Sequence, residues 1–112
     1  MIQEFKFGFF KIDGKPYYDD LKIVQGKIKP WEDRDKHDLH LNDLKELIAA
    51  QPELLIIGIG ASGLLQVSNE IKQELRAQNI HLVVKKTGEA CDDYNTALEE
   101  QKNVAALFHA TC

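Results

Sequence analysis

Three apolar segments of this chain each end in small, polar or ionisable residues, and these endings hold most of the side chains that could do chemistry. Residues 54–57 run into a glycine-rich stretch, residues 80–84 run into KKTGEAC, and residues 104–108 run into HATC. If the segments are parallel strands of one sheet, their endings lie along one edge, where α/β proteins commonly bind ligands. The candidate residues of this edge cleft are Gly58, Gly60, Gly63, Thr87, Glu89, Tyr94, Asn95, His109, Thr111 and Cys112.

An anionic ligand would suit this edge. Thr87 is expected to be the N-cap of the last helix, whose first turn offers unpaired N–H groups and a partial positive charge. Glu89 lies in the same turn and could itself occupy the place of an anion. His109 could donate a proton to such a ligand or accept one from it.

The glycines also match the dinucleotide-binding pattern G-x-G-x-x-G after a predicted strand. Three features oppose that interpretation. The next helix is expected to begin only at Ser68, the following strand ends in Lys85-Lys86 where an acidic residue would be needed, and the chain is too short for two mononucleotide-binding halves. We therefore favour glycines that serve a tight, crowded turn, and we predict no cofactor.

The two cysteines allow catalytic and structural interpretations. Cys91 follows Lys85 and Lys86, which could lower the thiol pKa, but its place beside Ala90 on a helix also suits packing. His109 and Cys112 could form a pair, or bind a metal together with Cys91, although a single His-x-x-Cys spacing is a weak zinc signal. We favour the structural interpretations and predict neither a metal nor a catalytic residue.

Residues 29–40 are charged and aperiodic, which is typical of a loop. Trp31 either anchors this loop on the core or forms part of an exposed contact patch. The ionisable residues that follow could form a polar rim, but a solvated loop is the preferred interpretation; they are Asp33, Arg34, Asp35, His37, Asp38 and His40.

Composition limits the class of protein. The chain has 112 residues, enough for about one domain, and its net charge of −4 disfavours non-specific nucleic-acid binding. No apolar run approaches the roughly 18 residues of a membrane span, and no basic segment leads into an apolar one at the N-terminus. Two cysteines do not make a disulfide framework, so we expect reduced thiols and a cytoplasmic location.

The elements that would position the edge fall into two parts of one domain, residues 1–112. Residues 1–30 predict an antiparallel meander: one strand from Phe5 to Phe10, a turn at Asp13-Gly14, a return at Pro16 to Tyr18, and another strand from Leu21 to Ile28. A helix with Leu41, Leu44, Leu47 and Ile48 on one face should follow and end before Pro52.

Residues 54–112 predict a βαβαβ unit with right-handed crossovers, because their apolar runs are nearly uninterrupted, as in strands covered on both faces. The helical stripes are Val67, Ile71 and Leu75, then Ala90, Tyr94, Ala97 and Leu98. The expected fold is a three-layer α/β domain in which helices pack on a central mixed sheet.

Taken together, several motifs resemble a known family. They are Gly8, Asp13-Gly14, Tyr17 and Asp20; Trp31, Arg34 and His37; IIGIGASG; Thr87 with Glu89-Ala90; Tyr94-Asn95; and the HATC at 109–112. The chain is similar over nearly its whole length to a small single-domain family of unknown biochemical function from archaea, bacteria and animals. That family includes an adipogenesis-associated protein and a mitochondrial assembly factor for respiratory complex I. The resemblance implies a compact α/β fold with an added antiparallel part and no established catalytic activity. Cys91 falls outside the pattern, and the loop at 33–38 has more acidic residues than the family pattern.

Two functions from different classes follow. The favoured one is a non-enzymatic interaction or assembly module with an unidentified protein partner, because the family resemblance points there and no paired acid–base or triad spacing is present. The alternative is a protein that binds a small anionic ligand, or is weakly catalytic, at the strand-end cleft. We expect a monomer or a small homo-oligomer.

Overall fold

The three apolar segments are parallel neighbours in the computed structural model, which describes residues 1–32 and 38–112. Strand β6 (Leu54–Gly58) lies between β7 (His81–Lys85) and β8 (Val104–Phe108), and both run parallel to it. The register pairs Gly58 with the last residue of each neighbour, Lys85 and Phe108. The predicted co-alignment of the strand ends is confirmed.

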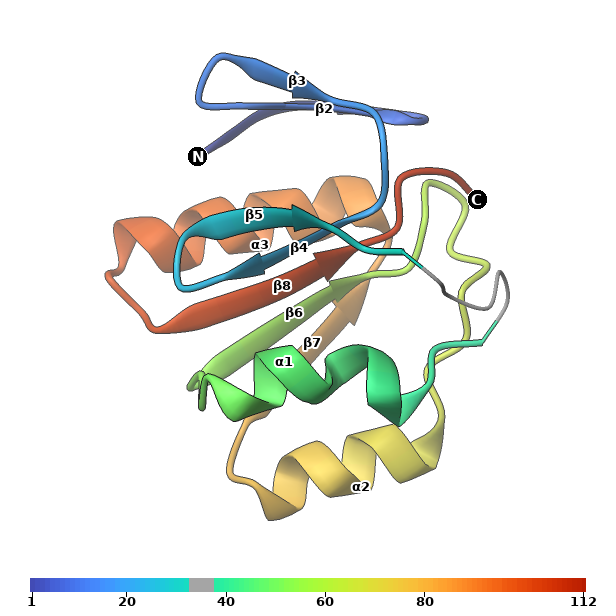
Figure 1. The fold of residues 1–112 in the computed structure, drawn as a ribbon, viewed down its shortest axis with the longest axis vertical. Coiled ribbons are helices and arrows are strands. Elements are labelled where there is room, and N and C mark those ends of the chain that lie inside the picture. Colours follow the sequence, from blue (N-terminus) through green and yellow to red (C-terminus); the bar gives the residue numbers. More distant parts are fainter. Residues whose placement is uncertain (33–37) are drawn as a thin grey trace.

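Two antiparallel strands complete this sheet. Strand β4 (Leu21–Val24) pairs with β8, and β5 (Lys27–Pro30) pairs with β4, so the strand order is β5-β4-β8-β6-β7. Figure 1 shows this mixed sheet at the centre of the molecule. A second antiparallel sheet contains β1 (Ile2–Lys6), β2 (Phe9–Ile12) and β3 (Lys15–Tyr17).

Two predicted strands in the first 30 residues were wrong, because each is a hairpin. The expected strand from Phe5 to Phe10 reverses at Phe7-Gly8, where Gly8 has φ +76°. The expected strand from Leu21 to Ile28 reverses at Gln25-Gly26, where both residues have positive φ. Alternation continues on both arms of a tight hairpin, so the pattern did not reveal either turn. The turn at Asp13-Gly14 is confirmed, with φ values of 49° and 83°.

In the described residues, four helical segments cover the two faces of the central sheet: η1 (Leu41–Leu44), a 3₁₀ turn; α1 (Lys45–Ala49); α2 (Asn69–Ala77); and α3 (Thr87–Glu99). The predicted helix before Pro52 is thus a 3₁₀ turn followed by a short α-helix. Ser68 caps α2 as its position predicts, and its hydroxyl accepts a hydrogen bond from Ile71 N at 3.3 Å. Leu98 was predicted to belong to the buried stripe of α3, but it is exposed.

The helices and the small sheet make a layered fold. In Figure 1, α3 and the small sheet lie on one side of the central sheet, while α1 and α2 lie on the other. Alternate side chains of β6 point to opposite sides: Leu54 and Ile56 join the cluster under α3, and Leu55 and Ile57 join the cluster under α1 and α2. The chain is therefore a single α/β domain whose central strands are covered on both faces.

Charged side chains tie α1 to the antiparallel half of the sheet. Lys22 Nζ lies 2.8 Å from Glu46 Oε1, and Lys29 also forms an ion pair with Glu46. The hydrogen bond from Lys22, and next the one from Lys29, lower the pKa of Glu46 from 4.5 to about 2.

The predicted charged loop begins later than expected, because Lys29 and Pro30 belong to β5, and the rest of it is described only at residues 31–32 and 38–40. Trp31 is buried in the cluster under α1 and α2, so it anchors the loop on the core. Asp38 and His40 are exposed, and Asp38 forms an isolated bridge with Gln66. The polar-rim prediction for Asp33, Arg34, Asp35 and His37 lies outside the described residues.

Candidate functional site

Residues 109–112 run along the carboxyl edge of the parallel strands, beside the loop that follows β6. Thr111 O accepts a hydrogen bond from Ala61 N at 2.6 Å, and Cys112 O accepts one from Leu64 N at 2.9 Å. On its other side the segment meets the small sheet, where Gly8 N donates to Ala110 O at 2.7 Å. The strand ends are thus lined by a segment of the same chain.

Gly60 permits this close approach. Its φ is +107°, and a Cβ at this position would lie 2.3 Å from both the backbone C and O of Cys112. Gly58 is also crowded, since a Cβ there would lie 2.9 Å from Thr87 Oγ1. Packing of the chain against itself therefore explains why glycine is needed at these two positions. The sequence favoured this crowded-turn interpretation over a dinucleotide motif.

Thr87 joins the three strand endings. Its buried hydroxyl accepts a hydrogen bond from Gly60 N at 2.9 Å and donates one to His109 O at 2.7 Å. The prediction that Thr87 is the N-cap of α3 was wrong: Lys86 occupies that position and Thr87 is the first helical residue. The hydroxyl binds groups that lie 27 and 22 residues away in the chain, which no local helix signal reveals.

His109 is buried against an acid that lies immediately before β4. Its Nδ1 lies 3.0 Å from Asp20 Oδ1, and the same carboxylate oxygen accepts a hydrogen bond from Ala110 N at 2.5 Å. The relative exposure is 3% for His109 and 9% for Asp20. Asp20 was noted in the resemblance, but the sequence suggested no role for it, because its partners are 89 and 90 residues away.

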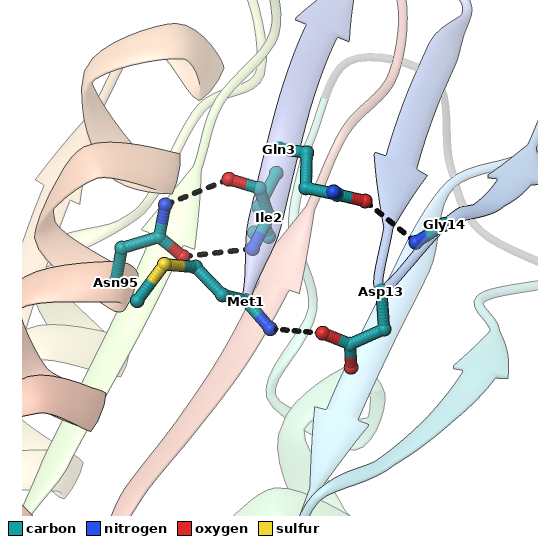
Figure 2. Close-up of polar contacts among 6 residues, drawn as sticks. All are labelled: Met1, Ile2, Gln3, Asp13, Gly14 and Asn95. Atoms are coloured by element: carbon teal, nitrogen blue, oxygen red, sulfur yellow. Dashed lines mark hydrogen bonds and ion pairs between the residues drawn. The ribbon is translucent and has the colours of Figure 1, made fainter.

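Tyr94 and Asn95 act farther along α3. They are seven or more residues beyond Thr87, which in a helix is roughly 10 Å. The Asn95 side chain donates to Ile2 O and accepts from Ile2 N, both at 2.8 Å, as Figure 2 shows. Tyr94 packs edge-on against Phe108, and burial is the largest cause of its raised pKa. These two residues thus attach α3 to the small sheet and the core.

The N-terminal strand is held to its neighbour by further polar contacts. The amino group of Met1 lies 2.7 Å from Asp13 Oδ1, and Gln3 Oε1 accepts a hydrogen bond from Gly14 N (Figure 2). These contacts hold β1 to the Asp13-Gly14 turn within the small sheet, whereas Asn95 attaches the sheet to α3.

Six of the ten candidate residues come together at this edge. Gly58, Gly60 and Thr87 contact residues 109–112, and His109, Thr111 and Cys112 belong to that segment. Gly63 lies in the neighbouring loop beside Lys86, and Glu89 is exposed in the first turn of α3. Tyr94 and Asn95 complete the set from positions farther along α3.

The cysteine thiols differ in their surroundings. Cys91 is buried, and this burial, together with nearby Asp92, raises its pKa to about 12. A thiolate is the nucleophilic form, so this environment opposes catalysis by Cys91 at neutral pH. Cys112 is exposed and free. Within residues 1–32 and 38–112, no three His, Cys, Asp or Glu residues are arranged to hold a metal ion.

Comparison with known proteins identifies the family. Residues 2–109 match the family described as "Protein of unknown function (DUF498/DUF598)". The chain belongs to this family. The DUF498 match spans both sheets and the helices of the described residues, so the confirmed resemblance extends over nearly the whole chain.

Solved structures agree with the DUF498 fold. A conserved hypothetical protein from Pyrococcus horikoshii is 28% identical, with a TM-score of 0.81 and coverage of 100% of this chain and 99% of the other. A Bartonella henselae protein described as an outer membrane protein is 24% identical, with a TM-score of 0.84 and coverage of 99% and 94%. A Bordetella pertussis protein described as a Mth938-like domain is 14% identical, with a TM-score of 0.71 and coverage of 97% and 84%.

None of the helices in the described part of this chain has both the length and the apolar character needed to cross a membrane.

Proposed function

We propose that this DUF498 protein is a non-enzymatic interaction or assembly module. The observation that carries the proposal is the occupancy of the strand-end edge by residues 109–112. Their backbone carbonyls accept hydrogen bonds from the loop after β6, and Gly60 lies in direct contact with Cys112. The place where a comparable α/β protein would bind a ligand is thereby used for internal packing.

The polar side chains at this edge also support a structural role. The Thr87 hydroxyl makes one hydrogen bond as acceptor and one as donor within the protein. Buried Asp20 holds both the His109 ring and the Ala110 amide. A general acid or base must reach the substrate proton directly or through one water, whereas these groups are buried and bonded to each other.

Exposed apolar side chains flank the same segment. Phe7 has a relative exposure of 66% and Leu64 of 55%, and we call these two residues the apolar rim. Gly8, next to Phe7, bonds to Ala110, and Leu64 bonds to Cys112, so the rim lies on both sides of residues 109–112. Single exposed apolar residues are common, but large ones on both sides of a hydrogen-bonded backbone segment suit a protein contact.

The experiment compares the wild type with the double variant Phe7→Ser/Leu64→Ser, and with Leu98→Ser as the matched control. Leu98 is also a large exposed apolar side chain, with a relative exposure of 36%, but it lies at the far end of α3. Each tagged protein is produced at native abundance in its source cells and cross-linked, and the dissociation constant of any recovered partner is then measured with purified proteins.

We expect the wild type and the Leu98 control to bind the partner equally and the rim variant to bind at least about tenfold more weakly, a loss of about 1.4 kcal/mol. Absence of any specific partner, or equal binding by the rim variant, contradicts the proposal in this form.

The competing function, binding of a small anion at the strand ends, has a direct test. A ligand at one hundred times its dissociation constant stabilises a protein by about 2.7 kcal/mol. We expect no such stabilisation from phosphate, carboxylates or nucleotides, because residues 109–112 would have to leave the edge first. A ligand that raises the melting temperature of the wild type by the corresponding amount would favour the anion-binding function instead.

A further inference from the structure

Strand β7 is an edge strand of the central sheet, since it is the last in the order β5-β4-β8-β6-β7 (Figure 1). Its sequence is HLVVK, and its register with β6 runs without a bulge. Its three central residues are apolar, and polar side chains occur only at its two ends. Such an edge presents unpaired backbone groups to other chains, and proteins usually protect it with lysine, proline, a bulge or a covering segment.

The other sheet edges carry those protective features. Strand β5 is KIKP, and strand β3 is KPY, so both have lysine and proline. Strand β1 has a bulge-like register shift between Ile2 and Glu4, and the backbone N and O of Ile2 are both bonded to Asn95 (Figure 2). Among the described strands, β7 is the edge that has none of these features along its central residues.

The backbone of β7 has an identifiable open side. His81 N donates to Glu53 O at 3.0 Å, and Lys85 O accepts from Ile59 N at 2.9 Å, so these two residues bond toward β6. Bonding alternates along a strand in a parallel ladder. The N–H and C=O groups of Leu82 and Val84 therefore point away from β6, toward the open edge.

Grooves lie on both faces of this edge. One, of about 540 Å³, lies between α2 and β7 and includes Leu82 and Val84 in its lining. The other, of about 240 Å³, lies toward α3 and includes Val83 and Ala97. Side chains of an extended strand point alternately to opposite faces, so a strand added to β7 would direct its side chains into both grooves.

The two grooves differ in the charge of the residues that line them. Lys72 and Arg76 line the larger groove from exposed positions on α2, and neither forms an ion pair with a described residue. In the smaller groove the charges are matched: Asp93 pairs with Lys85 at 2.7 Å, and Glu100 pairs with Lys102 at 3.1 Å. The α2 side of the edge is therefore positively charged and the α3 side is neutralised.

We propose that β7 binds an extended segment of a partner protein as an added strand, and that this segment places acidic residues over Lys72 and Arg76. Backbone hydrogen bonds to Leu82 and Val84 would supply affinity, and the charged groove would select the partner. The proposal rests on the interaction function above but assigns it a second surface, separate from the apolar rim.

A second copy of this chain fits the same edge less well. Two β7 strands paired about a twofold axis would place both α2 helices on the same face of the joined sheet. Lys72 and Arg76 of one copy would then face the same residues of the other, and like charges repel. Charge complementarity favours an acidic strand over self-association.

The test uses a short acetylated peptide that alternates Glu and Val, about as long as β7. One control peptide has Lys in place of Glu, and another keeps the Glu-Val sequence but has N-methylated amides that cannot pair as a strand. Binding is measured by calorimetry, and exchange of the protein amides by NMR. In the free protein the amides of Leu82 and Val84 should exchange much faster than that of Val83, and the Glu-Val peptide should slow them.

Protein variants separate charge from strand addition. Lys72→Glu/Arg76→Glu should weaken binding of the Glu-Val peptide about tenfold and favour the Lys-Val peptide, since both charge pairs become repulsive. The control Lys11→Glu/Lys15→Glu makes the same charge change at exposed positions of the small sheet, and it should bind like the wild type.

Four results would overturn the inference: no binding of the Glu-Val peptide, slow exchange of Leu82 and Val84 in the free monomer, equal binding of the N-methylated peptide, or protection of those amides that grows with protein concentration alone. The last result would assign the edge to a second copy. If the rim variant loses a native partner while the peptide does not bind, the interaction function stands and only the β7 inference fails.

Discussion

Replacing Thr87 by valine tests whether its hydroxyl holds the three strand endings together. The two side chains have nearly the same shape, so the substitution removes the hydroxyl without opening a cavity. Thr87 is fully buried, with a relative exposure of 0%. The amide of Gly60 and the carbonyl of His109 would then remain buried without the partners that now lie at 2.9 Å and 2.7 Å.

The expected loss of stability follows from those two groups. Each buried polar group left without a partner costs about 1–3 kcal/mol, so Thr87→Val should lower the free energy of unfolding by about 3 kcal/mol. At about 4 °C per kcal/mol for a domain of this size, the melting temperature should fall by roughly 12 °C. Thr87→Ser keeps the hydroxyl and loses one buried methyl group, which costs only about 1 kcal/mol.

The assay is urea unfolding of the wild type and both variants at neutral pH, followed by far-ultraviolet circular dichroism. The stability order should be wild type, then Thr87→Ser, then Thr87→Val. A valine variant at least as stable as the serine variant would refute the reasoning, because the methyl group and not the hydroxyl would then be the important contact.

Three further predictions concern other parts of the molecule. The pKa of Glu46 is lowered from 4.5 to about 2, so the stabilisation that ionised Glu46 gives the folded state is present above about pH 4.5 and is lost as the pH falls toward 2. The difference in stability between wild type and Glu46→Gln should therefore shrink over that range. A difference independent of pH would contradict this. Gly60→Ala should lower the free energy of unfolding in urea by about 3 kcal/mol, because Gly60 has a positive φ and the added Cβ would displace the backbone of Cys112. The helical control Gly88→Ala, whose added Cβ meets nothing closer than 3.9 Å, should be neutral or stabilising by up to about 1 kcal/mol. Equal effects of the two substitutions would show that the contact between Gly60 and Cys112 is dispensable. Iodoacetamide should label exposed Cys112 at least about a hundredfold faster than buried Cys91, whose pKa is raised to about 12; similar labelling rates under native conditions would disprove the burial argument.

Local signals predicted the elements whose cause is local. The continuous apolar runs at 54–57 and 104–108 predicted strands covered on both faces, and Asp13-Gly14 predicted a turn of positive φ. Ser68 predicted the start of α2 for the same kind of reason, since a capping hydroxyl acts on an amide a few residues away.

Prediction failed where one pattern has two structural solutions. Apolar alternation from Phe5 to Phe10 describes a single strand as well as two arms joined at Phe7-Gly8, and the turn depends on the pairing of β1 with β2. The prediction for Thr87 failed for a related reason, because a threonine near the start of a helix can cap it or form hydrogen bonds elsewhere. In the structure its hydroxyl bonds to Gly60 and His109, which are remote from it in the chain.

By itself, the sequence determined that three apolar strands end in small and polar residues, and parallel pairing then places those endings at one edge. Only the tertiary structure decided what occupies that edge. Residues 109–112 fill it because Asp20, 89 residues before His109, holds the segment down and Gly60 leaves room for Cys112. Such contacts depend on distances between atoms that are remote along the chain, and the spacing of residues in the sequence does not determine those distances.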